Sequence, residues 1–456
     1  MTLPPQYRER MVSLLGARAE RYFAAMEEAP VTSIRLNGRK NPAACPTGAG
    51  GTPVEWCETG LRLAERPRFT LDPLLHAGAY YVQEASSMIH RHIISHLTPL
   101  IGGKLRVLDL CAAPGGKTTA MIDALPEGSV VVANEYVASR ASVLEENVAK
   151  WGYPDTIVCQ GPAERFSTPL FDIVAVDAPC SGEGMMRKET EAVAQWSPRL
   201  TGQCAALQRD ILDTAAEALK PGGYLIYSTC TFNREEDEEN ARYLRDTHGM
   251  EPVEIPLDCS WGILPGIDTD IPCMRFIPGF TNGEGLFVSV MRKPGEAQPV
   301  SGARRRSRDC HGFEAAANTG CEGWTDSRHS DFRRRRDRIY ALSPETAAML
   351  EALPDKVNIL SAGIETAILK GKQPAPSPRL ALSLGMRPEA FPTAELGLDD
   401  ALAYLRRETP AMPAGTPKGF VAVTYGDLPL GFVKNLGPRA NNLYPSEWRI
   451  KMQITR

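Results

Sequence analysis

The stretch "LRVLDLCAAPGGKTT", residues 105–119, combines a short apolar run, a Gly-Gly turn and the start of a helix. Gly115 and Gly116 would let the backbone approach a ligand closely, and the helix start that follows favours negative charge. The stretch is not a GxxxxGK[ST] phosphate loop, because position 111 is Cys rather than Gly, and it contains no GxGxxG. By itself it predicts a strand, a turn and a helix, joined by either a nucleotide-type site or a plain turn.

Residues 104–293 continue the alternation of strand-like and helical segments. The expected strands are "LRVLDL", "SVVVANE", "TIVCQG", "DIVAVDA", "YLIYSTC" and "GLFVSVMRK". The expected helices include "ASRASVLEENVAKWG" and "TGQCAALQRDILDTAAEALKPGG", the second ending at Pro221-Gly222-Gly223. Alternation of this kind predicts an α/β fold around a parallel sheet.

The length of 456 residues favours two or three domains. We expect an N-terminal cap at 1–100, a core at 101–293, an Arg-rich flexible linker at 294–337 and a second compact region at 338–456. The last part, "KGFVAVTYGDLPLGFVKNLGPRANNLYPSEWRI", alternates apolar and polar residues around turns, which predicts a small β-barrel. The arginines of the linker are interpreted either as a solvated segment or as a tether that contacts phosphates.

The composition is that of a folded protein, with 43% hydrophobic and 23% charged residues and a net charge of −4. No window approaches the roughly 18 apolar residues of a membrane span, and the N-terminus lacks the order of a signal peptide. The 11 cysteines contain no CxxC pair, so we expect no metal. A reduced, cytoplasmic protein without a membrane partner follows, and we expect a monomer.

Acidic residues and thiols stand at the ends of the expected strands. Glu135 ends the second strand, where a carboxylate can accept hydrogen bonds from an unphosphorylated ribose, as in S-adenosylmethionine or NAD. Asp177 and Cys180 follow the fourth strand, and Cys230 follows the fifth. Because the carboxyl ends of parallel strands face one crevice, we expect both thiols at the same pocket edge as the Gly-Gly turn. Burial as small hydrophobic residues is the expectation for Cys111, Cys159 and Cys204 instead.

Three motifs, "DLCAAPGGKTT", "VDAPCSGEGMMRK" and "YSTCTFNREEDEEN", occur here in the order and spacing of a known family. They resemble the NOL1/NOP2/Sun family of RNA 5-methylcytosine methyltransferases, and most of all its bacterial RsmF-like subgroup, which methylates 16S ribosomal RNA. The segments "SIRLNG" and "YYVQEASSM" match the family ahead of the core, and "GFVKNLGPRANNLYPSEWRI" resembles the end of its C-terminal extension. The resemblance covers nearly the whole chain except the Arg-rich segment.

The resemblance implies a Rossmann-like class I methyltransferase sheet with an N-terminal cap and a C-terminal PUA-like β-barrel that binds RNA. It implies S-adenosylmethionine as the cofactor and 16S ribosomal RNA, or the small ribosomal subunit, as the partner. By analogy Cys230 is the nucleophile that adds to C6 of cytosine, Cys180 assists product release and Asp177 contacts the base edge. The swapped assignment of the two cysteines stays open. The implied cofactor-binding residues are Cys111, Ala112, Ala113, Pro114, Gly115, Gly116, Lys117, Glu135, Gln160 and Asp177.

Two positions depart from the family pattern. Many members carry an acid after the third strand, to hold the adenine amino group, where this chain has Gln160. The terminal turn "GPRANNLYP" carries Arg439 where relatives tend to have Lys, which puts the strength of RNA binding in doubt. Alternatives that we keep are a transfer RNA substrate and a non-catalytic RNA-binding assembly factor. An NAD-linked dehydrogenase would need GxGxxG and a hydride-handling His or Tyr, and neither is evident.

Overall fold

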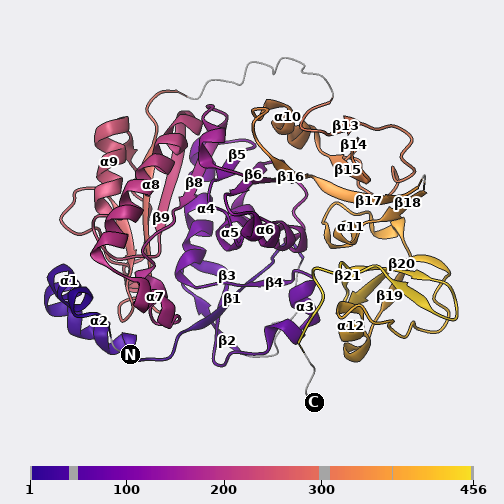
Figure 1. Ribbon diagram of the computed structural model, residues 1–456, viewed down its shortest axis with the longest axis horizontal. Coiled ribbons are helices and arrows are strands. Elements are labelled where there is room, and N and C mark those ends of the chain that lie inside the picture. Colours follow the sequence, from indigo (N-terminus) through magenta and orange to yellow (C-terminus); the bar gives the residue numbers. More distant parts are fainter. Residues whose placement is uncertain (1–2, 41–49, 297–308, 372, 453–456) are drawn as a thin grey trace.

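The structure is a computed structural model that describes residues 3–40, 50–296, 309–371 and 373–452 (Figure 1). In Figure 1 the N-terminal strands lie below the central sheet, and the C-terminal region lies to its right. None of the described helices is long and apolar enough to cross a membrane.

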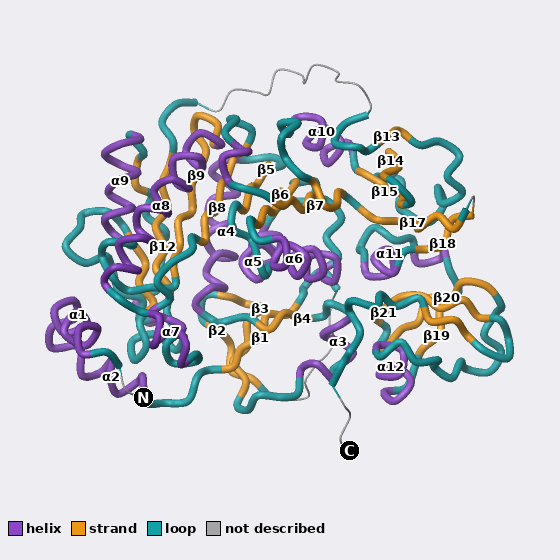
Figure 2. Tube along the Cα trace, viewed as in Figure 1, coloured by secondary structure: helices purple, strands orange, loops and turns teal. Residues whose placement is uncertain are grey.

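The N-terminal region consists of two helices and an antiparallel sheet. The helices are α1 (Pro5–Leu15) and α2 (Ala19–Met26), and the short α3 (Pro73–His76) follows later. The strands, in sheet order, are β2 (Gly51–Val54), β3 (Cys57–Leu63), β1 (Thr32–Leu36) and β4 (Tyr80–Val82). In Figure 2 the strands β1 to β4 lie below the central sheet, and Val54 and Trp56 share an apolar cluster with Val107 of that sheet, so this region packs against the core.

The central sheet contains all six strands that the sequence predicts. In sheet order its main path is β10 (Glu251–Pro252), β12 (Leu286–Arg292), β9 (Leu219–Thr229), β8 (Phe171–Asp177), β5 (Arg106–Asp109), β6 (Val130–Glu135), β7 (Thr156–Gln160) and β16 (Ile359–Ala362). The five strands from β9 to β7 are parallel, and β11 (Cys273–Phe276) pairs with β12 beside this path. The order reverses at β5, which places the 110–116 loop at the switch point where such folds bind ligands.

Helices cover both faces of this sheet. One face carries α4 (Ile89–Ile101), α5 (Gly116–Ala124) and α6 (Ala138–Trp151), and the other carries α8 (Pro198–Ala218), α9 (Glu238–His248) and α10 (Pro344–Ala352). The short helix α7 (Thr190–Gln195) precedes α8. The prediction that α8 ends at Pro221-Gly222-Gly223 is wrong, because the helix ends at Ala218 and these residues lie in β9.

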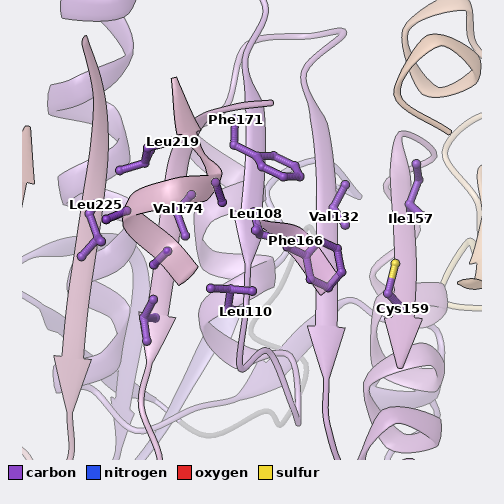
Figure 3. Packing of buried hydrophobic residues seen from close by; sticks show 14 of the residues in the cluster. Leu108, Leu110, Val132, Ile157, Cys159, Phe166, Phe171, Val174, Leu219 and Leu225 are labelled. Carbon is purple, nitrogen blue, oxygen red and sulfur yellow. The ribbon is translucent and has the colours of Figure 1, made fainter. Parts of the chain in front are cut away.

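The strands of the central sheet consist mainly of apolar residues, because helices cover both faces of the sheet. Figure 3 shows side chains of β5, β6, β7, β8 and β9 along one face of the sheet, with Phe166, from the segment after β7, lying among them. Cys159 belongs to this core and is fully buried, as expected for a thiol that acts as a small hydrophobic residue. Burial on two sides explains why these segments read as continuous apolar runs rather than alternating ones.

The edge strand β16 comes from the C-terminal region. It pairs antiparallel with β7, with Ile359 opposite Cys159 and Ala362 opposite Ile157. Residues beyond 338 therefore complete the core sheet, and a boundary at 338 does not separate two independent units.

The prediction of a flexible linker at 294–337 is wrong for residues 309–337; residues 297–308 lie outside the described part of the chain. Residues in the range 309–337 form the first two strands of a five-stranded sheet. Its order is β13 (Glu314–Ala315), β14 (Asp331–Arg335), β15 (Arg338–Leu342), β17 (Ile364–Lys370) and β18 (Gln373–Pro376). Its arginines pair within the protein: Arg333 contacts Asp331 and Glu351, and Arg338 contacts Glu365. Ion pairs within the protein therefore account for Arg333 and Arg338, whereas Arg334 and Arg336 are exposed.

The last part of the chain forms a smaller sheet around its own core. Its strands are β19 (Thr393–Glu395), β20 (Gly419–Tyr425), β21 (Leu428–Asn435) and β22 (Ala440–Asn442), with α12 (Leu398–Leu405) against them. The helix α11 (Pro378–Leu382) and residues of β20 and β21 share a second apolar cluster with the five-stranded sheet. The two C-terminal sheets are thus packed together.

A buried carboxylate joins the C-terminal region to the core. Asp155, just before β7, accepts hydrogen bonds from the hydroxyls of Ser343 and Thr346 and lies 2.8 Å from Nη2 of Arg328. Burial would raise the pKa of Asp155, but His329, Ser343 and the charge of Arg328 outweigh it and hold the pKa below its ordinary value.

We predict that Asp155→Asn destabilises the full-length protein by about 3 kcal/mol at pH 7, because it leaves Arg328 without a buried partner. The loss is read from the urea midpoint followed by circular dichroism. It shrinks as the pH falls below about 4, because a lowered carboxyl pKa gives stability only above that range. The control is Glu127→Gln, which removes an acid 83% exposed that contacts the same Arg328; its effect should stay below about 0.5 kcal/mol. Equal effects of the two changes would contradict the account.

Candidate active site

The two thiols after β8 and β9 lie side by side. The two strands are parallel neighbours, and Asp177 stands opposite Ser228 in their register. Cys180 and Cys230 follow these positions, and their sulfur atoms are 3.2 Å apart. Both side chains are half-buried, so the pair borders the open end of the sheet.

An ion pair connects the thiols to the 110–116 loop. Nζ of Lys117, in the first turn of α5, lies 2.8 Å from Oδ2 of Asp177, and the Ser228 hydroxyl donates to Oδ1. Burial lowers the pKa of Lys117, but Asp177, together with Cys230 and Glu84, outweighs it and raises the pKa overall. Lys117 is therefore a fixed positive charge beside the acid and the thiols.

The two thiols are not equivalent. A hydrogen bond to the Cys230 sulfur, burial and the charge of Cys230 together raise the pKa of Cys180 well above its ordinary value. Glu236 adds to the effect by its negative charge. Cys180 is therefore harder to ionise than an ordinary thiol.

The 110–116 loop forms a cavity that also reaches the ion pair of Lys117 and Asp177. The cavity measures about 160 Å³ and is lined by residues 111–114, Gly116, Lys117 and Asp177 from the core and by residues 81–84 and Ser87 from the N-terminal side. Gly115 precedes α5 with φ of +111°, a conformation that a side chain would strain, and an added Cβ would lie 3.3 Å from Leu144. The first N–H groups of α5 lack helical partners and so favour a ligand that accepts hydrogen bonds.

Glu135 ends β6 as a buried carboxylate, 3% exposed. Oε1 accepts from the backbone N–H of Val137, and Oε2 lies 3.5 Å from Nη1 of Arg140. Arg140 also donates to the carbonyl of Ala113, so it links the carboxylate to the loop. The chain sequence offered no signal for Arg140, because its role depends on where α6 starts relative to the loop.

Gln160 ends β7 and is held by the C-terminal region. Nδ2 of Asn358 donates to Oε1 of Gln160 at 3.2 Å, and the backbone N–H of Gln160 donates to the carbonyl of Asn358. Nε2 of Gln160 donates to the carbonyl of Tyr136, which follows Glu135 and is 68% exposed. Asn358 could not be found from sequence, because it lies about two hundred residues further along the chain.

The other thiols and cations have different settings. Burial raises the pKa of Cys111, so its thiol stays protonated and contributes to the loop through backbone and bulk. Arg187, after the "SGEG" turn, is buried against Glu284 at 2.7 Å. Among the described residues, no group of three or more His, Cys, Asp or Glu side chains gathers as metal ligands would.

The fold and this loop define a methyltransferase. A methyltransferase homologue from Pyrococcus horikoshii matches 63% of this chain and 94% of its own, with a TM-score of 0.53 and 26% identity. NSun6 from Pyrococcus horikoshii, solved with SFG, matches 64% of this chain and 99% of its own, with a TM-score of 0.54 and 19% identity. The second likeness concerns the fold alone.

Family models match three parts of the chain: the N-terminal domain of 16S rRNA methyltransferase RsmF at 3–85, 16S rRNA methyltransferase RsmB/F at 99–292 and the methyltransferase RsmF PUA domain at 391–450. Ribosomal RNA small subunit methyltransferase F of Salmonella agona is 32% identical, covering 97% of this chain and 95% of that protein. The same protein of Salmonella schwarzengrund is 33% identical over the same shares. This chain belongs to the RsmB/F family of 16S rRNA methyltransferases.

Proposed function

We propose that this protein transfers a methyl group from S-adenosylmethionine to C5 of a cytosine in 16S ribosomal RNA, through a covalent bond between Cys230 and C6. The observation that carries the proposal is the pair of sulfur atoms 3.2 Å apart beside the loop of the cofactor cavity. The names of the relatives, ribosomal RNA small subunit methyltransferase F, support the substrate.

The chemistry explains why a thiol is needed. C5 of cytosine is too weak a nucleophile to accept a methyl group directly. When the Cys230 thiolate bonds to C6, the ring electrons shift so that C5 becomes nucleophilic. After methylation the proton on C5 leaves, its electron pair re-forms the C5–C6 double bond, and the C6–S bond breaks to release the thiolate.

Cys180 suits the second half of this sequence. The hydrogen bond to Cys230 raises the pKa of Cys180 most, and burial and the charge of Cys230 raise it further. Once the Cys230 sulfur is bonded to carbon, that charge is gone and Cys180 ionises more readily. Cys180 can then accept the C5 proton and assist release. The reverse assignment would require Cys180, the thiol whose pKa is raised, to start the reaction as a thiolate.

Asp177 and Lys117 complete the base site. The carboxylate of Asp177, fixed by Lys117 and Ser228, can accept hydrogen bonds from the cytosine amino edge or stabilise charge on the ring as the adduct forms. The base must leave its stack to reach the thiols, as in other enzymes that modify bases.

The described residues fit S-adenosylmethionine, which supplies an electrophilic methyl group when bound. The N–H groups of the loop from Cys111 to Lys117 would hold its carboxylate and Glu135 its ribose hydroxyls. Gln160, oriented by Asn358, would contact the adenine edge in place of the acid that many relatives carry.

RNA binding would be shared with the region that matches the PUA domain at 391–450. Exposed cations there, including Lys418, Lys434 and Arg439, can contact phosphates. A transfer RNA substrate remains the alternative, and the intact site argues against a non-catalytic assembly factor. The monomeric state and the cytoplasmic location stay predictions.

We predict that Cys230→Ala abolishes both the methylated product and any covalent complex with 16S ribosomal RNA. Cys180→Ala should form a protein–RNA complex that survives a denaturing gel, because the adduct forms but is released slowly. Product is measured with radiolabelled S-adenosylmethionine. Transfer RNA serves as the comparison substrate and should give neither product nor complex. Methylation by Cys230→Ala would show that another group is the nucleophile.

We predict that Glu135→Ala weakens binding of S-adenosylhomocysteine by at least about tenfold, because a charged hydrogen-bond acceptor is lost. Asn358→Ala should weaken it by a few-fold through the freed Gln160 side chain, with an unchanged KM for RNA. Calorimetry on each full-length variant measures the affinity for S-adenosylhomocysteine, and a methylation assay gives the KM for RNA. The matched control is Asn441→Ala in β22, an exposed Asn remote from the loop in sequence, which should leave the affinity unchanged. Unaltered binding by Glu135→Ala, or tighter binding of NAD, would contradict the cofactor assignment.

A further inference from the structure

The loops that carry the two thiols rest on a buried polar cluster that none of the roles above uses. We call Ser181, Gln208, Thr231, Asn233 and Glu236 the sub-thiol cluster; each is at most 7% exposed. Its centre is the carboxylate of Glu236, which is fully buried. A buried carboxylate is costly unless hydrogen-bond donors surround it, so its partners indicate what it is for.

One oxygen of Glu236 holds the Cys180 loop from both sides. Oε2 accepts the backbone N–H of Ser181 at 3.0 Å, directly after Cys180. Nε2 of Gln208, on α8, donates both to this oxygen at 2.8 Å and to the carbonyl of Pro179 at 2.9 Å, directly before Cys180. The residues on either side of the thiol are therefore tied to one atom.

The other oxygen of Glu236 faces the segment after Cys230. Oε1 accepts Nδ2 of Asn233 at 2.8 Å, and the same amide donates to the Thr231 hydroxyl at 2.9 Å. The hydroxyls of Ser181 and Thr231 are 3.0 Å apart, which joins the two loops directly. Glu236 is thus the point where both thiol loops meet.

The two thiols depend on this cluster to different degrees. Cys230 follows the last residue of β9 directly, and its carbonyl accepts the N–H of Gly184 at 2.8 Å. Cys180 lies three residues beyond β8, and the hydrogen bonds on either side of it lead to Glu236 and Gln208. Loss of the Glu236 carboxylate should therefore displace Cys180 more than Cys230.

We propose that Glu236 is a positioning residue that holds Cys180 against the Cys230 sulfur and is required for product release more than for methyl transfer. The inference rests on the proposed function, in which Cys180 acts after the methyl group has moved. The charge of Glu236 also contributes to the raised pKa of Cys180, after the larger effects of Cys230 and burial. Glutamine cannot replace Glu236, because the N–H groups of Ser181, Gln208 and Asn233 donate to both carboxylate oxygens. The glutamine NH2 group would place a donor against one of these donors.

The test compares Glu236→Gln with Glu235→Gln, its neighbour on the same loop, whose partially exposed carboxylate pairs with Arg10. Each full-length variant reacts with 16S ribosomal RNA and S-adenosylmethionine, and the covalent complex, single-turnover methyl transfer and release are measured separately. We expect Glu236→Gln to accumulate the complex and release it about tenfold more slowly, with methyl transfer within about twofold of the unmodified protein. Glu235→Gln should match the unmodified protein.

Cys180→Ala is run alongside to separate the two proposals. If Cys180→Ala traps the complex while Glu236→Gln releases it at the normal rate, the inference about Glu236 is wrong and the proposed function stands. If Cys180→Ala traps nothing, the proposed role of Cys180 fails, and the inference with it. A parallel loss of complex and product in a Glu236→Gln protein of normal thermal midpoint also overturns the inference.

Where Glu236→Gln lowers the thermal midpoint, Gln208→Leu decides by the same criteria. It removes the hydrogen bonds from Gln208 to the carbonyl of Pro179 and to Oε2 of Glu236, and it keeps the Glu236 carboxylate with its bond to the N–H of Ser181. Slow release by this variant supports the inference, and normal release overturns it.

Discussion

The parallel pairing of β8 with β9 is the constraint on which the site depends. Because Asp177 stands opposite Ser228, the loops that leave the two strands start level with each other, and Cys180 and Cys230 meet with 3.2 Å between their sulfur atoms. A slip of this register would separate the thiols and detach Asp177 from Ser228. The apolar core on both faces of the sheet holds the register, so burial far from the sulfurs determines the chemistry at its edge.

Electrostatics then distinguishes two thiols that the strands merely bring together. The pKa of Cys180 is raised because its thiol forms a hydrogen bond with Cys230 and is buried beside negative charge. Close by, Lys117 forms an ion pair with Asp177. In the mechanism we propose, the same contacts give the reaction an order, because bonding of the Cys230 sulfur to carbon removes the charge that opposes ionisation of Cys180. By the further inference, the sub-thiol cluster holds Cys180 in the position that this proposed exchange requires.

Local sequence patterns predicted the central fold well. They did not predict the contacts between residues that are remote in sequence. All six core strands, the turn at Gly115 and the meeting of Cys180 with Cys230 follow from apolar runs and from the rule that parallel strands end at one edge. The pairing of β16 with β7 and the contact of Asn358 with Gln160 join residues remote in sequence, and no local pattern reports them. Arg333 and Arg338 could not be distinguished from solvated arginines in the sequence, because their partners Glu351 and Glu365 lie further along the chain. Glu236 lies in a run of acidic residues, and the sequence does not indicate that this one carboxylate is buried.

In the proposed mechanism the Cys230 sulfur bonds to the ring, and Cys180 acts later. The nucleophile can be identified with the unmodified protein, which has both thiols, and 16S ribosomal RNA in which cytidine is replaced by 5-fluorocytidine. Fluorine at C5 cannot leave as a proton does, so the adduct persists after methyl transfer. Digestion and mass spectrometry then identify the cysteine that carries the nucleotide. We expect a single modified peptide that contains Cys230. A nucleotide on Cys180, or no adduct in a protein that methylates ordinary RNA, would show that Cys230 is not the nucleophile.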